Sequence, residues 1–363
     1  MVLKIKLLIV FLILSFTAFS QGLKPGFDKE EYLEALKISA ITSKDSSYFE
    51  KIEAPSKFQM IYQSEIMGLD NFWDLWQHQS QNVAAISIRG TTPNPISWLE
   101  NFYAAMVPAT GKLDIQEGFA FDYALADNPR AAVHIGWLVG TAFLSRDMLP
   151  KMDSLYQSGT KEFLIIGHSQ GGGIAYLLTA HFRSLQRQGN IPQDLKFKTY
   201  CSAAPKPGNL YFAYAYEHMD YDGWAYNVVN AKDWVPEVPM SIQTTGDFND
   251  INPFQNAKVM ISKQKFPKNL ALKRVYNQLD KPTRKAQKNY QKYLGEMASK
   301  AVSKNIEGFN SPEYYGSNHY VRTGKTIVLT PDSDYEKAFP DDVGHLFPHH
   351  LHPAYLLLTE KLP

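Results

Sequence analysis

The chain has 363 residues, 44% of them hydrophobic, and a net charge of +1 at pH 7. This length and composition suffice for one large domain with a buried core, or for two small domains. A net charge so close to zero argues against nucleic acid as a partner of the whole molecule, because binding to a phosphate backbone needs an excess of basic charge.

The first twenty residues have the pattern of a secretion signal. Two lysines precede an apolar run over residues 7–19, and Ala18-Phe19-Ser20 fits the small-x-small cleavage rule. The apolar run is shorter than the roughly 20 residues that span a bilayer. We therefore predict a cleaved signal peptide over residues 1–20 and export to the periplasm or the extracellular space, with an uncleaved anchor as the alternative.

Beyond the leader, strand and helix patterns alternate. We expect helices over residues 28–40, 96–106, 134–156 and 169–187, and strands over residues 58–66, 82–89, 162–166, 197–204 and 225–229. Trp73 and Trp76 are predicted to lie on a helical turn between the first two strands. This alternation favours an α/β fold over residues 21–363, in which helices cover both faces of a mainly parallel sheet.

The most informative motif is Gly167-His168-Ser169-Gln170-Gly171. An apolar, β-branched strand pattern precedes it, and apolar residues at helical spacing follow it. A serine between two glycines at a sharp strand-to-helix turn is typical of the nucleophile elbow, where strand and helix backbones approach closely. We predict that Ser169 is the nucleophile and that Cys201, the single cysteine, is a small buried core residue.

A serine nucleophile needs a histidine to accept its proton and an acid to orient that histidine. In the chain order typical of this elbow, the acid and then the histidine follow the serine. Asp233 comes directly after a predicted strand, where catalytic groups gather in parallel sheets. Alternative acids lie in turn-like sequence, where Asp is common for local hydrogen bonding: Asp220, Asp222, Asp247 and Asp250.

Histidines cluster before the last predicted helix: His345, His349, His350 and His352. His350 lies in the loop just ahead of this helix, which is expected to begin at Pro353 with His352 as its cap. A metal site at His345 and His349 is the rival hypothesis, although the intervening proline spoils the helix that would align them. We predict neither a metal nor a cofactor.

Attack of a serine on a substrate carbonyl also needs donors that stabilise the oxyanion formed there. The backbone N–H of Gln170, next to the predicted nucleophile, is one such donor. Thr91 lies in a loop after an earlier strand and offers both an N–H and a hydroxyl. We therefore predict an oxyanion hole formed by Thr91 and Gln170.

A basic segment interrupts the α/β pattern before the histidine cluster. Residues 255–305 contain thirteen Lys or Arg and only two acids. Apolar residues recur at helical spacing on either side of Lys281-Pro282, which predicts two basic amphipathic helices inserted into the domain. A solvated basic surface is the simpler interpretation, and docking on anionic lipid or another acidic polymer is the alternative.

Several motifs, taken in order, resemble the class 3 (fungal-type) lipase family. They are Arg89-Gly90-Thr91 with Trp98, Val133-His134-Ile135-Gly136-Trp137, Gly167-His168-Ser169-Gln170-Gly171-Gly172, Ala204-Pro205-Lys206-Pro207-Gly208-Asn209 and Asn230-Ala231-Lys232-Asp233-Trp234-Val235-Pro236. The resemblance runs from about residue 83 to 239 and resumes at the C-terminal histidines. It implies an α/β-hydrolase fold and the hydrolysis of esters, often of lipids.

Carried over residue by residue, the resemblance makes Ser169 the nucleophile and Asp233 the acid, and it places Thr91 and Gln170 in the oxyanion hole. Asn101 is a departure, since an acid is common at this position after the tryptophan. The linking cysteines of the secreted fungal forms are also absent.

The same resemblance bears on the base and on a lid. Family members place the histidine five or three residues before an aromatic residue of the last helix, so Tyr355 indicates His350 or His352, and we favour His350. A lid is implied over residues 92–106. Residues 114–130 look unlike the compact members of the family.

The sequence therefore predicts an exported serine ester hydrolase that forms an acyl-enzyme and acts on lipid esters. Esters of phenols or carbohydrates are the alternative substrates. A catalytically idle scaffold that binds lipid or a partner is the alternative function. No sequence feature sets the acyl chain length, the need for interfacial activation or the oligomeric state.

Overall fold

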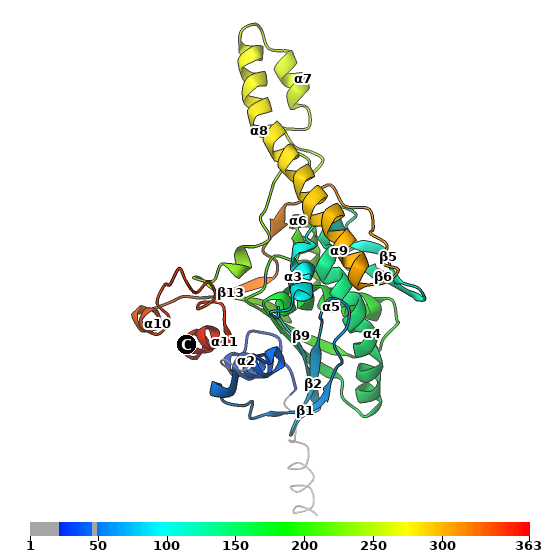
Figure 1. The fold of residues 1–363 in the computed structure, drawn as a ribbon, viewed down its shortest axis with the longest axis vertical. Coiled ribbons are helices and arrows are strands. Elements are labelled where there is room, and N and C mark those ends of the chain that lie inside the picture. The colour runs from blue at the N-terminus through cyan, green and yellow to red at the C-terminus, as the bar shows by residue number, and fades with distance from the viewer. Residues whose placement is uncertain (1–21, 46–48) are drawn as a thin grey trace, which may run out of the picture.

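The computed structural model describes residues 22–45 and 49–363 (Figure 1). The predicted signal peptide, residues 1–20, lies outside the described residues. Within the described part of the chain, no helix combines the length and the apolar character that a membrane span requires.

A seven-stranded sheet, in the order β1-β2-β3-β8-β9-β11-β13, forms the centre of the molecule. Its strands are β1 (Phe58–Gln63), β2 (Trp73–His78), β3 (Val83–Ile88), β8 (Glu162–His168), β9 (Lys196–Ser202), β11 (Ala225–Asn230) and β13 (Lys325–Leu329). The five strands from β3 to β13 pair in parallel, and β1 and β2 extend one edge in antiparallel fashion. The predicted, mainly parallel sheet of an α/β fold is confirmed.

Helices cover both faces of this sheet (Figure 1). The helices of this body are α2 (Lys29–Ser43), α3 (Pro95–Phe102), α4 (Ile135–Gln157), α5 (Gln170–Arg187), α6 (Leu210–Met219), α10 (Ser333–Ala338) and α11 (His352–Glu360). Successive side chains of a strand point to opposite faces, and β3 shows the result. Ile86 and Ile88 join the core with α4 and α5, whereas Val83 and Ala85 join the core with α2 and α11. Cys201 is buried in β9, as predicted.

Short elements complete the domain. A four-stranded sheet joins β12 (Tyr320–Val321), β10 (Gly208–Asn209), β7 (Ala132–His134) and β4 (Met106–Pro108), and a hairpin joins β5 (Thr110–Gln116) to β6 (Phe119–Ala124). Two single turns of 3₁₀-helix are η1 (Phe49–Lys51) and η2 (Val235–Glu237). The hairpin accounts for much of residues 114–130, the region that looks unlike the compact family members.

The helical turn predicted at Trp73 and Trp76 is wrong, because both residues belong to β2. Residues three apart share a face on a helix but point to opposite faces on a strand. Trp73 is accordingly buried in one core and Trp76 in the other. The helix expected over residues 96–106 also ends early, at Phe102, because Met106 begins the next strand.

The basic segment forms α7 (Ala257–Ser262), α8 (Lys268–Gln291), a π-helix η3 (Lys292–Met297) and α9 (Ala298–Asn305). The break predicted at Lys281-Pro282 is wrong, since α8 continues through Pro282. A proline inside a helix removes the hydrogen bond to the carbonyl four residues earlier. That carbonyl belongs to Gln278, an exposed residue, so water can replace the lost partner. Figure 1 shows α7 and most of α8 extending away from the body, whereas α9 lies against it.

Candidate active site

The predicted strand–turn–helix motif is present where β8 meets α5. Ser169 stands between them with φ 61° and ψ −130°, a region that non-glycine residues rarely adopt. A Cβ atom at Gly167 would overlap the carbonyl of Gly171, and one at Gly171 would overlap the carbonyl of Ile88. Glycine at both positions therefore allows the turn to hold the Ser169 side chain beyond the end of the sheet.

Asp233 follows the C-terminal end of β11, and its side chain is completely buried. Its Oδ1 accepts a hydrogen bond from the backbone N–H of Val235 at 2.9 Å. Its Oδ2 accepts from Nδ1 of His350 at 2.8 Å. Because a carboxylate only accepts, the His350 proton lies on Nδ1, and Nε2 is left as the acceptor on the ring.

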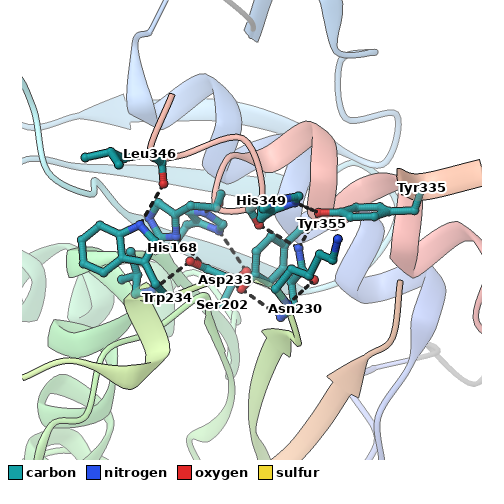
Figure 2. Close-up of polar contacts among 12 residues, drawn as sticks. His168, Ser202, Asn230, Asp233, Trp234, Tyr335, Leu346, His349 and Tyr355 are labelled. Carbon is teal, nitrogen blue, oxygen red and sulfur yellow. Dashed lines mark hydrogen bonds and ion pairs between the residues drawn. The ribbon is translucent and has the colours of Figure 1, made fainter. Parts of the chain in front are cut away.

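Tyr355 and Asn230 hold this pair in place (Figure 2). The Tyr355 hydroxyl donates to Oδ2 of Asp233 at 2.8 Å and accepts from the Asn230 backbone N–H at 3.0 Å. Burial, together with the nearby Asp233 charge, raises the pKa of Tyr355 well above its usual range, so the hydroxyl keeps its proton. The Asn230 side chain donates to the carbonyl of His349 at 2.8 Å, which ties the loop that carries His350 to β11.

A second chain of hydrogen bonds reaches the same loop from α2. His168 Nε2 lies 2.7 Å from the carbonyl oxygen of His350, and Nδ1 lies 3.0 Å from Oγ of Ser202. The carbonyl can only accept, so Nε2 donates, Nδ1 accepts from Ser202, and the Tyr32 hydroxyl donates to Ser202 at 2.7 Å. Burial lowers the pKa of His168 well below its usual range, in keeping with this neutral tautomer. Helix α2, which carries Tyr32, thus helps to fix the His350 backbone.

His352, the second candidate for the base, lines the same cavity as Ser169 and His350, but it has a different hydrogen-bond partner. Its Nε2 is 3.0 Å from Oγ of Ser39 on α2, and its ring stacks on that of His168 with centroids 4.1 Å apart. Burial lowers the pKa of His352 to about 3. The structure therefore brings His350 to Asp233 and packs His352 against α2. The cap of α11 is Leu351 rather than His352, so this helix begins one residue earlier than expected.

The two other histidines of the cluster pair with separate acids. His345 Nδ1 lies 2.6 Å from Asp342, and His349 Nε2 lies 2.9 Å from Asp341. Among residues 22–45 and 49–363, no group of three His, Cys, Asp or Glu side chains could hold a metal ion.

The alternative acids are engaged away from the serine. Asp220 accepts from the Trp224 backbone N–H at 2.7 Å, Asp247 accepts from the Thr244 backbone N–H at 2.7 Å, and the exposed Asp250 pairs with an arginine. Asp222 lines a different cavity, near Trp224.

Ser169 and His350 line one cavity of about 880 Å³, together with Thr91 and Gln170. Asp233 lies behind His350, out of contact with the cavity. Large apolar side chains form much of the remaining wall: Trp98, Phe102, Trp137, Tyr290, Leu294 and Phe347. Such an apolar wall around a few converging polar groups is typical of a site for a hydrophobic ligand.

The loop with Thr91 lies directly against the elbow. A Cβ atom at Gly90 would lie 2.9 Å from the carbonyl oxygen of His168 and 3.3 Å from Cβ of Ser169. Asn101 accepts from the Trp137 indole N–H at 3.0 Å, which turns its NH₂ group toward Oγ1 of Thr91 at 2.8 Å. The Thr91 hydroxyl accepts this bond, so its own hydrogen is available to an acceptor in the cavity. Asn101, seen in the sequence only as a departure from the family, thus orients the Thr91 hydroxyl.

The Gln170 side chain ties the elbow to α3. Its Nε2 donates to Glu100 at 2.6 Å, and its Oε1 accepts from Ser97 at 3.2 Å. Burial raises the pKa of Glu100 well above its usual range. Sequence reasoning missed this buried carboxyl, as it missed the roles of His168 and Tyr32, because each contact joins segments far apart in the chain. The predicted lid, residues 92–106, includes α3, and these bonds join α3 to the elbow.

Comparison with known proteins finds one family model and several solved structures that are similar to this chain. The family model described as lipase (class 3) matches residues 85–242. Solved structures that resemble the chain include the triacylglyceride lipase of Rhizomucor miehei, at 19% identity, with 60% of this chain and 78% of that chain covered and a TM-score of 0.42. Another is the Lip2 lipase of Yarrowia lipolytica, at 16% identity, with coverages of 60% and 77% and a TM-score of 0.45.

The comparison with curated proteins finds no match. The family match begins within β3 and includes Thr91, the elbow, Asp233 and the loop after it, whereas His350 lies outside the matched residues. Residues 85–242 therefore match the class 3 lipase family.

Proposed function

We propose that this protein is an exported lipase that hydrolyses lipid esters through Ser169, His350 and Asp233. The observation that carries the proposal is the shared cavity: Ser169 and His350 line it, and the 2.8 Å bond from His350 to the buried Asp233 fixes the imidazole tautomer. This tautomer points an unprotonated Nε2 away from the acid, as a general base requires.

The proposed reaction has two halves. His350 Nε2 accepts the Ser169 proton while Oγ bonds to the ester carbonyl carbon. The N–H groups of Thr91 and Gln170, with the Thr91 hydroxyl, stabilise the oxyanion. His350 then protonates the leaving alcohol as the carbon–oxygen bond breaks, which leaves an acyl-Ser169. In the second half, a water molecule gives a proton to His350 and attacks the acyl carbon. The tetrahedral intermediate then collapses, His350 returns the proton to Oγ of Ser169, and the carboxylic acid is released.

The apolar wall of the cavity supports lipid as the substrate class. A panel of p-nitrophenyl esters of graded chain length, beside phenolic and carbohydrate esters, tests this assignment. We expect kcat/KM to rise with chain length from acetate to octanoate, because each added methylene is removed from water on binding. Turnover of a feruloyl or acetylated-sugar ester that exceeds that of every fatty ester would contradict the lipid assignment.

The Thr91 hydroxyl provides a second test of the proposed site. Thr91→Val keeps the backbone N–H and the branched shape but removes the hydroxyl that Asn101 orients, so kcat should fall by roughly 10²-fold, the usual loss for one oxyanion donor. Thr91→Ser, which retains the hydroxyl, should keep most of the activity. Equal activity of the valine and serine variants would exclude a role for the hydroxyl.

We further propose that residues 21–363 are one exported domain, released by cleavage after Ser20. We also propose that the enzyme meets lipid at an anionic membrane surface through residues 255–305. The leader pattern and the excess of thirteen basic residues over two acids in that segment support these proposals. The mass of the mature chain tests the cleavage: a first residue of Gln21 supports it, and a chain that begins at Met1 contradicts it.

A further inference from the structure

Helix α8 buries little of its surface against the rest of the protein. Of its 24 residues, only Asp280 and Tyr290 are buried. Figure 1 shows the helix projecting far beyond the body, with only the short α7 beside its outer part. Helices in folded proteins are stabilised mainly by packing an apolar face, so an exposed face of this length indicates a binding surface.

Three of the four large exposed apolar side chains of α8 form one stripe, and the fourth, Leu270, lies on the opposite face. Leu272, Val275 and Leu279 are spaced by three and four residues and therefore share a face. Their exposed fractions are 37%, 58% and 68%. Ala286 and Tyr290, seven and eleven residues after Leu279, lie on the same face, because α8 is continuous across Pro282.

The face opposite the stripe is basic. Four exposed cations lie there: Arg274, Lys281, Lys285 and Lys288. Among the described residues, no ion pair joins any of these four to an acid. Three more exposed lysines surround the turn between α7 and α8: Lys263, Lys265 and Lys268. The turn also exposes Phe266, at 78%.

The inner end of the stripe belongs to the catalytic cavity. Tyr290, at the end of α8, and Leu294, in the π-helix that follows, line the same cavity as Ser169. Tyr290 is buried there in a small core with Ala104 and Tyr320. One face of one continuous helix thus runs from the exposed outer end to the wall of the cavity, so whatever binds the stripe also comes to lie before the mouth of the site.

We propose that the surface formed by α7 and α8 docks on a bilayer that contains anionic phospholipid. The apolar stripe enters the interfacial region, the cations meet the anionic headgroups, and the shared wall presents the cavity to the lipid. An apolar stripe opposed by a lysine- and arginine-rich face, on a helix with low overall hydrophobicity, is the pattern of helices that lie in a membrane interface. The proposal deepens the proposed lipase function, because it names the surface at which the substrate is met.

Vesicle binding by the full mature chain tests this proposal. Phosphatidylcholine vesicles with and without 30% phosphatidylglycerol are compared by flotation, for the parent and for Val275→Ser/Leu279→Ser. We expect the parent to bind anionic vesicles at least tenfold more strongly than neutral ones and to lose this preference in high salt. The double variant should bind at least tenfold more weakly than the parent and should hydrolyse a long-chain ester in anionic vesicles correspondingly more slowly.

The matched control is Ile61→Ser/Ile66→Ser, which removes two apolar side chains of similar exposure, 48% and 62%, from the region of β1. It should bind vesicles like the parent. Both double variants should hydrolyse soluble p-nitrophenyl butyrate at the parental rate, because the substituted side chains lie outside the cavity. Parental vesicle binding by Val275→Ser/Leu279→Ser, or a parent that binds only an acidic protein and no vesicle, would overturn the docking proposal. Absent hydrolysis of the soluble ester by the parent would instead refute the proposed function.

Discussion

Ser169→Ala should lower the hydrolysis of short p-nitrophenyl esters by roughly 10³- to 10⁶-fold, the range found when a serine nucleophile is removed and the oxyanion hole remains. The Ser169 side chain makes no capping bond to α5, and the residue stands at the mouth of the cavity. Removal of its Oγ should therefore cost little stability. Initial rates at saturating substrate measure the loss, and thermal unfolding checks that the variant is folded.

The control is Ser154→Ala, which makes the same change at an exposed position of α4. This variant should retain the parental rate. A folded Ser169→Ala variant with more than a tenth of the parental activity would show that another group attacks the ester, and the proposed site would have to be abandoned.

Asp233→Asn should lower kcat by roughly 10⁴-fold, as expected when the acid of such a triad can no longer hold the histidine tautomer. Oδ1 of Asp233 accepts from the Val235 N–H, so the new amide NH₂ would replace Oδ2, which now accepts from His350 and Tyr355. Three donors would then face one another. His350 would have to move its proton to Nε2, where it could no longer accept the proton of Ser169.

The matched control is Asp341→Asn, which alters an exposed carboxylate that lies 2.9 Å from Nε2 of His349, the neighbour of His350. Because His349 does not line the cavity, this variant should keep at least half of the parental kcat. Equal losses in the two variants would mean that the whole histidine loop, rather than one tautomer, controls the rate.

The sequence predicts best where the chemistry is local. The elbow requires a strand, a serine between glycines and a helix in immediate succession, and all of these are visible in residues 162–187. The parallel sheet follows from the same alternation of patterns. Asp233 was favoured for its position after a strand, and the structure places it beside His350, 117 residues further along the chain.

The errors arise where tertiary contacts decide. Trp73 and Trp76 fit a helical turn by spacing, but their segment, β2, pairs with β1 on one side and β3 on the other and is buried on both faces. Pro282 predicts a break, yet an exposed turn of α8 tolerates the missing hydrogen bond because water is available there. Propensity is a weak guide at both places, since burial and solvent access determine the outcome.

The residues that support the candidate site could not be predicted from the sequence, for a related reason. Tyr32 and Ser202 act on the His350 loop through His168, and Glu100 reaches the elbow through Gln170. No spacing rule links residues that meet only after the sheet has formed. Their signal is a buried polar group that needs a partner, and it becomes visible only with the coordinates.

Labelling by a fluorophosphonate, mapped by mass spectrometry, tests most directly whether Ser169, His350 and Asp233 form one reactive unit. Such a probe reacts with a serine only when a base accepts its proton. The account predicts a single adduct on Ser169, formed at least a hundredfold more slowly in Asp233→Asn and at the parental rate in Asp341→Asn. An adduct on another serine, or a folded protein that stays unlabelled, would contradict it.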